Sequence, residues 1–204
     1  MNALRPQETI LAALTCLLLT SGCSAADVAT DHASTPFSRS TSSPIPISGP
    51  TSSPTTGPVG PSDGVLPEGQ AATGTGLPGI DKLDAQLLEA LRRASADAKS
   101  QGIAIVITSG WRSERYQQSL LDEAITNYGS KEEALHWVSS PEKSSHVLGK
   151  AIDVGPTSAA DWLIQHGSSY GLCQSYANEM WHFELTTRPG SVCPAPAASP
   201  NQSK

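Results

Sequence analysis

The chain has 204 residues; 38% of them are hydrophobic and 5% aromatic, and the sequence contains 17 Gly and 16 Pro. This mixture indicates one globular domain accompanied by segments that are too polar to fold. The net charge of -6 and the lack of a basic cluster in the sequence argue against a nucleic-acid-binding protein.

The N-terminal residues are typical of an export signal. Residues 10–20 form an apolar run that is too short to span a bilayer comfortably. The run ends in Leu19-Thr20-Ser21-Gly22-Cys23, which is similar to the lipobox of bacterial lipoproteins. We therefore expect residues 1–22 to be a signal peptide and a lipid on Cys23 to hold the protein at the outer face of the cytoplasmic membrane. The alternative is cleavage after Ala26 and free secretion to the cell wall.

Composition divides the remaining chain into three parts. Residues 23–78 are rich in Ser, Thr, Pro and Gly, which cannot bury enough apolar surface to fold, so we expect a disordered tether there. The folded domain is expected over residues 79–193, and a disordered tail over residues 194–204.

Within the folded domain, apolar spacing predicts a mixed order of helices and strands. Helices are expected from a cap at Asp81 to Gly102 and over residues 114–127, 131–138 and 159–166; strands are expected over residues 103–107, 151–154 and 181–185. This order predicts an α+β fold with a small antiparallel sheet flanked by helices. Trp137 and Trp162 are interpreted as core residues.

Cysteine usage agrees with export. Cys16 lies in the signal and Cys23 would carry lipid, which leaves Cys173 and Cys193 as a pair in an oxidising compartment. A bridge between them would close a loop of about 20 residues and stabilise the fold by ~3 kcal/mol in the chain-entropy model. Two unrelated thiols are the alternative.

Two imidazoles and a carboxylate occur in an order that can hold a metal. His146 and Asp153 are separated by Gly149, where a tight turn would bring them face to face, and His182 follows later. Three such ligands leave one position open, as in catalytic zinc sites. Glu179 precedes His182 by three residues and is a candidate base, although the two would point to opposite faces of a regular strand. A surface His beside a strand-end Asp is the alternative for the first pair.

The combined pattern is more specific than its parts. Ser144-x-His146-x-x-Gly149-x-Ala151-x-Asp153 with Glu179-x-x-His182 resembles the zinc D-alanyl-D-alanine carboxypeptidases of the VanY type, which are related to the VanX dipeptidases. Ser109-Gly110-Trp111-Arg112-Ser113 looks like the Ser-Gly-Tyr-Arg-Ser element of that family. The resemblance covers about residues 83–185. It implies a zinc peptidase domain of the hedgehog and DD-peptidase type.

The resemblance also implies roles for individual residues. His146, Asp153 and His182 would bind Zn2+, and Glu179 would act as general base and then as general acid. Arg112 would stabilise the oxyanion or hold the substrate.

Substrate contacts are expected around these groups. Ser144 would hydrogen-bond the terminal carboxylate of the substrate. Trp111 and Trp181 are expected to be walls of the site, with core packing as the alternative. Gln117 is expected to line the groove, with an exposed helix position as the alternative. Met180 and Glu142 stand where the family commonly has Pro and Gly, and both departures could alter specificity.

The resulting functional hypothesis is a monomeric zinc D,D-carboxypeptidase that removes the terminal D-Ala from peptidoglycan stem peptides. One alternative is an L,D-carboxypeptidase or a peptidoglycan endopeptidase on the same scaffold. A non-catalytic zinc-containing module that binds the wall, and a lipoprotein with a structural zinc, are further alternatives. The intact Glu179 argues against the binding module, and the lack of a fourth Cys or His ligand argues against a structural zinc.

Overall fold

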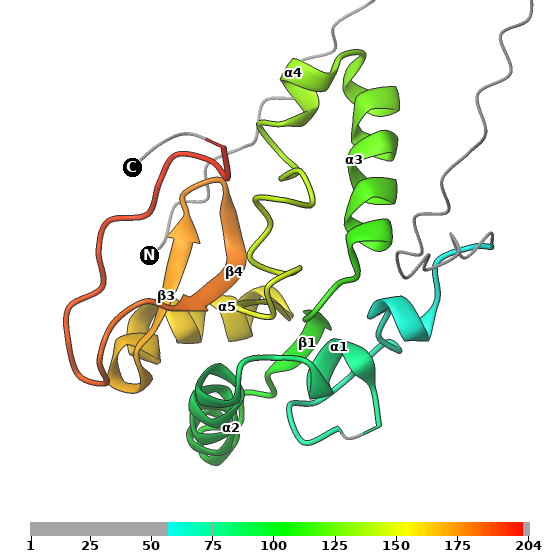
Figure 1. The fold of residues 1–204 in the computed structure, drawn as a ribbon. Helices are drawn as coiled ribbons and strands as arrows, with labels where there is room; N and C mark the ends of the chain where they lie inside the picture. Colours follow the sequence, from blue (N-terminus) through cyan, green and yellow to red (C-terminus); the bar gives the residue numbers. More distant parts are fainter. Residues whose placement is uncertain (1–56, 75, 202–204) are drawn as a thin grey trace, which may run out of the picture. The chain divides into compact units, whose positions relative to one another are not determined.

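The computed structural model describes residues 57–74 and 76–201 (Figure 1). Four strands form one sheet in the order β1-β2-β4-β3, and every neighbouring pair is antiparallel. The strands are β1 (Val106–Ser109), β2 (Ala151–Gly155), β3 (Leu172–Tyr176) and β4 (Glu179–Leu185). The predicted α+β class with a small antiparallel sheet is confirmed.

Five α-helices and two 3-10 turns surround this sheet in the described residues. They are η1 (Pro61–Asp63), α1 (Pro78–Asp81), α2 (Ala85–Ser100), α3 (Glu114–Tyr128), α4 (Lys131–Ala134), α5 (Thr157–His166) and η2 (Gly167–Tyr170). Helices α2 and α5 pack against the sheet and each other, whereas α3 packs with the short α4 (Figure 1). Figure 1 shows α3 and α4 beside the long connection that leads into β2.

Helix α2 shows how the sequence builds the main core. Asp84 caps its start, because the carboxylate accepts hydrogen bonds from the backbone N–H groups of Gln86 and Leu87. The helix then buries one stripe with helical spacing, formed by Leu87, Ala90, Leu91, Ala94 and Ala98. This stripe joins Ile152 of β2 and Phe183 of β4 in one apolar cluster, so the helix fixes the sheet that carries the site.

Several elements differ from the expectations; for example, strand β4 begins at Glu179, two residues earlier than expected. The first helix begins after Asp84 rather than at a cap on Asp81, because the short α1 precedes it. Strand β1 begins at Val106, three residues later than expected, and α4 ends at Ala134. Strand β3 was not anticipated.

The folded domain is longer than residues 79–193. Asp63 is buried and accepts hydrogen bonds from the Ser113 hydroxyl and the Arg115 guanidinium at the start of α3. Ala71 forms an isolated bridge with Val106 of β1. Residues 58–78, which composition assigned to the tether, therefore pack onto the domain in their described part. The predicted signal peptide and residues 23–56 lie outside the described residues.

The C-terminal residues are also packed. Ala197 forms a parallel bridge with Tyr176, and Ser199 is buried, so residues 194–201 do not behave as the expected disordered tail. The predicted disulfide between Cys173 and Cys193 is confirmed, with Cα atoms 5.6 Å apart. No helix among the described residues has the length and hydropathy needed to cross a bilayer.

Candidate metal centre and substrate pocket

Strand pairing brings two of the predicted ligands together. Asp153 of β2 lies directly opposite His182 of β4 in the antiparallel register. His146 comes from the loop before β2, where Gly149 adopts a φ of +69° and allows the predicted tight turn. A Cβ atom at Gly149 would lie 2.4 Å from the Lys82 carbonyl oxygen, so the turn requires glycine.

The three predicted ligands form one compact, buried group. His182 Nδ1 lies 3.1 Å from Asp153 Oδ1 and 3.2 Å from His146 Nε2, and His146 Nε2 lies 3.3 Å from Asp153 Oδ1. Tetrahedral zinc with bonds of about 2.0–2.1 Å holds its ligand atoms about 3.3 Å apart. The triangle therefore has the dimensions that a four-coordinate metal ion requires, and its residues fit zinc.

Hydrogen bonds fix which nitrogen of each imidazole faces the centre. His146 Nδ1 lies 2.8 Å from the Gly110 carbonyl oxygen and must donate to it, which leaves Nε2 as an electron-pair donor. His182 Nε2 lies 3.0 Å from Glu184 Oε1, which leaves Nδ1 for the metal. A carboxylate or carbonyl behind each ligating imidazole is the usual arrangement in metal sites. Glu184 was not identified from the sequence.

The electrostatics suit a cation. Burial raises the pKa of the Asp153 carboxyl, but His146, His182 and Arg112 outweigh this effect and hold that pKa well below its usual range. Burial lowers the pKa of His146, which favours the neutral ligand form. Burial also lowers the pKa of His182, yet its hydrogen bonds to Asp153 and Glu184 raise it to about 9. A proton and a metal ion therefore compete for His182 Nδ1.

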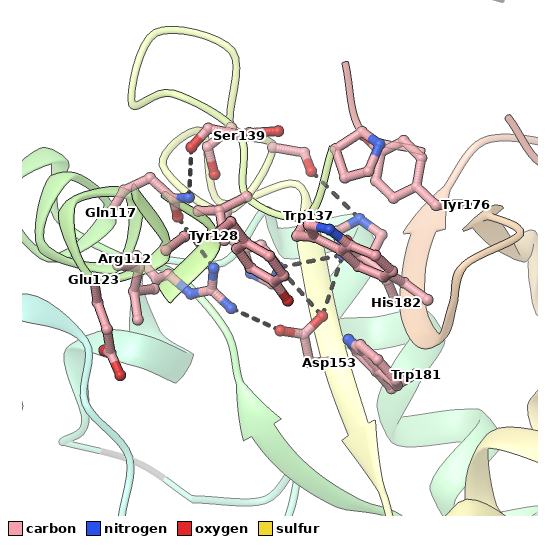
Figure 2. A pocket seen from close by; sticks show the side chains of 18 of the residues that line it. Arg112, Gln117, Glu123, Tyr128, Trp137, Ser139, Asp153, Tyr176, Trp181 and His182 are labelled. Carbon is pink, nitrogen blue, oxygen red and sulfur yellow. Dashed lines mark hydrogen bonds and ion pairs between the residues drawn. The ribbon is translucent and has the colours of Figure 1, made fainter. Parts of the chain in front are cut away.

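Arg112 lies behind the carboxylate ligand. Its Nη2 donates to Asp153 Oδ2 at 2.7 Å, its Nε to the Ser109 hydroxyl at 2.7 Å and its Nη1 to Gln117 Oε1 at 3.1 Å. Figure 2 shows the guanidinium between Gln117 and Asp153. Arg112 therefore holds Asp153 Oδ2, while Oδ1 faces the two imidazoles. The expected contact of Arg112 with the substrate stays a prediction.

Gln117 is buried, which contradicts the alternative of an exposed helix residue. Its side-chain amide donates to the Ser139 carbonyl at 2.9 Å while its oxygen accepts from Arg112. It therefore connects the metal centre to the loop after α4.

Glu179 stands beside the centre without belonging to the ligand triangle. Its Oε2 lies 3.7 Å from His182 Nδ1, and burial raises the pKa of its carboxyl to about 7. Both residues are on β4, whose register with β3 is irregular. Tyr176 pairs with Glu179 and Gln174 pairs with Phe183, so a shift of two residues along β3 corresponds to four residues along β4. This irregularity lets two side chains of one strand approach the same centre.

A pocket of about 360 Å3 opens over these groups (Figure 2). Its lining includes the predicted residues Arg112, Gln117, Ser144, His146, Asp153, Glu179, Trp181 and His182. Trp181 is 45% exposed, as a wall residue should be. Trp111 is not among the lining residues; it packs against the main core and carries the Lys82 ammonium 3.7 Å from its ring centroid. Core packing, the alternative to a wall of the site, therefore describes Trp111 better.

Several pocket residues were missed or misinterpreted. Trp137 was interpreted as core, but it is 48% exposed, lines the pocket and stacks on Tyr128 with ring centroids 5.7 Å apart. Tyr176 also lines the pocket, 4.8 Å from the His182 ring centroid. Pro200 does so from the C-terminal segment. No short sequence pattern marks these residues, because chain segments far apart in sequence bring them to the pocket.

A protein family matches the part of the chain that carries this site. The family model described as VanY, D-alanyl-D-alanine carboxypeptidase, matches residues 80–187. A D-alanyl-D-alanine carboxypeptidase of Enterococcus faecalis (strain ATCC 700802 / V583) is 27% identical in an alignment 128 residues long, and the match covers 50% of this chain and 48% of the relative. The match thus spans about half the length of that relative.

Similar solved structures include two peptidases. One is a mutant of the vancomycin resistance D,D-pentapeptidase VanY in complex with Zn(II), at 24% identity and a TM-score of 0.49, covering 52% of this chain and 73% of the other. The other is the LdcB LD-carboxypeptidase, at 22% identity and a TM-score of 0.49, covering 61% of this chain and 68% of the other. Since the family model matches more than half of the chain, this protein belongs to the VanY D-alanyl-D-alanine carboxypeptidase family.

Proposed function

We propose that this protein is a zinc-dependent D,D-carboxypeptidase that removes the terminal D-Ala from peptidoglycan stem peptides. The observation that carries the proposal is the buried triangle of His146, Asp153 and His182 with Glu179 beside it in an open pocket. Membership of a D-alanyl-D-alanine carboxypeptidase family supports this choice of bond.

The residues divide the work of hydrolysis among them. His146, Asp153 and His182 would hold zinc, which when bound supplies Lewis acidity toward water and toward the scissile carbonyl. Glu179 would accept the proton of the attacking water and return it to the leaving amine. The buried Ser144 would donate a hydrogen bond to the terminal carboxylate of the substrate, which selects for a chain end.

The raised pKa of Glu179 reflects its partly buried position at the pocket wall. A carboxylate in such a place is poorly hydrated and therefore accepts a proton more readily than one in water. Asp153, by contrast, is held ionised by its neighbours. The two carboxyl groups are thus suited to different roles, one as proton carrier and one as ligand.

The test uses the full chain and a synthetic muramyl pentapeptide ending in D-Ala-D-Ala. Mass spectrometry should show loss of one D-Ala, and a chelator should stop the reaction until zinc is added back. Glu179→Gln should lower kcat by about a hundredfold or more while zinc stays bound, because general acid–base catalysis is worth about 10²–10⁴-fold.

The control variant is Val192→Ala, at a position that is 91% exposed on the C-terminal loop, and it should cleave normally. Cleavage of the tetrapeptide alone would replace the proposal with an L,D-carboxypeptidase. Cleavage of an internal bond would indicate an endopeptidase, and zinc binding without any cleavage would indicate a binding module.

We also propose that the protein works outside the cytoplasm, anchored through Cys23. The Cys173–Cys193 disulfide supports this proposal, because such bonds persist in oxidising compartments. Metabolic labelling with a fatty-acid probe should mark the wild-type protein and not a Cys23→Ala variant. Equal labelling of both proteins would contradict anchoring through this cysteine.

A further inference from the structure

The C-terminal segment, residues 194–201, follows a fixed path along the sheet and is called the strap below. It begins directly after Cys193, which is bonded to the buried Cys173 of β3. The Ala197 N–H donates to the Ser175 carbonyl at 2.9 Å, and the Ala177 N–H donates to the Ala197 carbonyl at 2.7 Å. Figure 1 shows this red segment rising beside β3 toward the β3–β4 turn. The strap is therefore attached at one end by a covalent bond and in the middle by strand pairing.

The far end of the strap reaches the substrate pocket. Ser199 is buried, Pro200 lines the pocket, and the side-chain amide of Asn201 donates to the Leu135 carbonyl. Leu135 directly follows α4. The strap thus spans from the edge of the sheet to the α4 segment.

A second amide supports the same stretch of backbone. The Asn178 side chain, from the turn between β3 and β4, donates to the His136 carbonyl at 3.3 Å. Two asparagine amides from different segments therefore hold two consecutive carbonyls immediately before Trp137. Trp137 in turn stacks on Tyr128 of α3 at an interplanar angle of 10°. One of the two amides that hold the backbone before this aromatic wall, that of Asn201, therefore comes from the strap.

The pocket that results is small. A volume of about 360 Å3 lies near the lower end of the range for ligand pockets, about 300–1,000 Å3. One wall comes from α3, another from residues 137–139, and Pro200 adds the strap to the lining. A single peptide end fits such a space more readily than a branched one.

We propose that the strap is the specificity wall of the pocket: by fixing Pro200 and supporting the Trp137 wall, it admits a linear peptide end and excludes a branched, crosslinked one. This inference rests on the proposed carboxypeptidase function. The amides of Asn201 and Asn178 are positioning groups, because they act through the backbone before Trp137 rather than on the substrate.

The test compares two substrates on four proteins. The substrates are a linear pentapeptide and the same pentapeptide carrying a second stem peptide on the side-chain amine of its third residue. The proteins are the wild type, a chain ending after Pro196, the full-length Asn201→Ala variant and the Val192→Ala control. Ending the chain after Pro196 keeps Cys193 and its disulfide while removing the pairing residue Ala197 and everything beyond it.

The ratio of kcat/KM for the linear over the crosslinked peptide is the quantity to measure. In the shortened chain it should fall about tenfold, the scale on which the shape of a pocket discriminates substrates. Asn201→Ala should lower the ratio by a smaller factor, and Val192→Ala should leave it at the wild-type value. If the shortened chain does not fold, the full-length Asn201→Ala and Pro200→Gly variants decide the question.

Failure of the inference and failure of the proposed function give different results. If the shortened chain still cleaves the linear peptide with an unchanged ratio of kcat/KM values, that result overturns the proposal on specificity and leaves the proposed carboxypeptidase function standing. Absence of metal-dependent cleavage of either peptide by the wild type overturns the function. Equilibrium binding of both peptides to Glu179→Gln protein, with and without the strap, gives the ratio without turnover and tests the wall in either case.

Discussion

Removal of the disulfide is the perturbation whose size the structure defines most closely. Cys193→Ala breaks the bond while Cys173, which is buried in β3, keeps its sulfur in the core. The bridged residues are 20 apart in sequence, and a closed loop of that length corresponds to about 3 kcal/mol of stability in the chain-entropy model. At about 2–4 °C per kcal/mol for a domain of this size, the melting temperature should fall by about 10 °C.

Urea unfolding monitored by circular dichroism measures the loss of unfolding free energy, and a thermal scan measures the fall in melting temperature. Val192→Ala is the neighbouring control. Val192 is almost fully exposed one residue earlier, so its truncation should leave the unfolding midpoint within experimental scatter. A loss of less than about 1 kcal/mol in Cys193→Ala would show that strand pairing alone restrains the segment, because disulfides usually contribute about 2–4 kcal/mol. That result would refute the reasoning from loop closure.

Three further predictions concern the metal, the turn and acid stability. Glu184→Ala should weaken zinc binding by about 10–100-fold, because the His182 imidazole loses its hydrogen-bond acceptor; competition with a chromogenic chelator measures this. Gly149→Ala should destabilise the fold more than Gly190→Ala in thermal unfolding, since both glycines have positive φ but a Cβ only at Gly149 would collide with backbone. Burial raises the pKa of Asp63, but hydrogen bonds from Ser113 and Arg115 outweigh this effect and hold that pKa below its usual value. Its ionised form therefore stabilises the fold above the unfolded pKa, and Asp63→Asn should flatten the loss of stability as pH falls through acid unfolding.

Each of these predictions has an outcome that contradicts it. Wild-type zinc affinity in Glu184→Ala would mean that the imidazole needs no acceptor. Equal melting temperatures for Gly149→Ala and Gly190→Ala would mean that the turn moves away from the Lys82 carbonyl at no cost. An identical acid-unfolding profile in Asp63→Asn would assign the pH dependence to other carboxyl groups.

The metal ligands could be anticipated from the sequence because their local spacing suggested a site and the resemblance to one family assigned it. Gly149 between His146 and Asp153 marks a turn that only glycine tolerates, and the short strand after it is evident from its apolar residues. The opposing position of His182 then follows from antiparallel pairing. The sequence also showed that Glu179 and His182 would point to opposite faces of a regular strand. The structure resolves this by a shift in the register between β4 and β3, and β3 was not predicted.

The rest of the site could not be predicted because it is built by contacts between distant segments. Trp137 carries the same apolar character whether it packs in a core or forms a pocket wall, and only its stacking on Tyr128 places it in the wall. The polar composition of residues 58–78 and 194–201 predicted disorder. Both segments are nevertheless held by backbone hydrogen bonds, which composition does not report.

The two isolated bridges have a consequence for the behaviour of the protein at high concentration. In the order β1-β2-β4-β3 the outer strands are β1 and β3, and each would present unpaired N–H and C=O groups to other molecules. Ala71 covers part of β1 and Ala197 covers part of β3. A recombinant version trimmed to residues 79–193 would expose both edges at once, and it should form aggregates by strand pairing that the longer chain avoids.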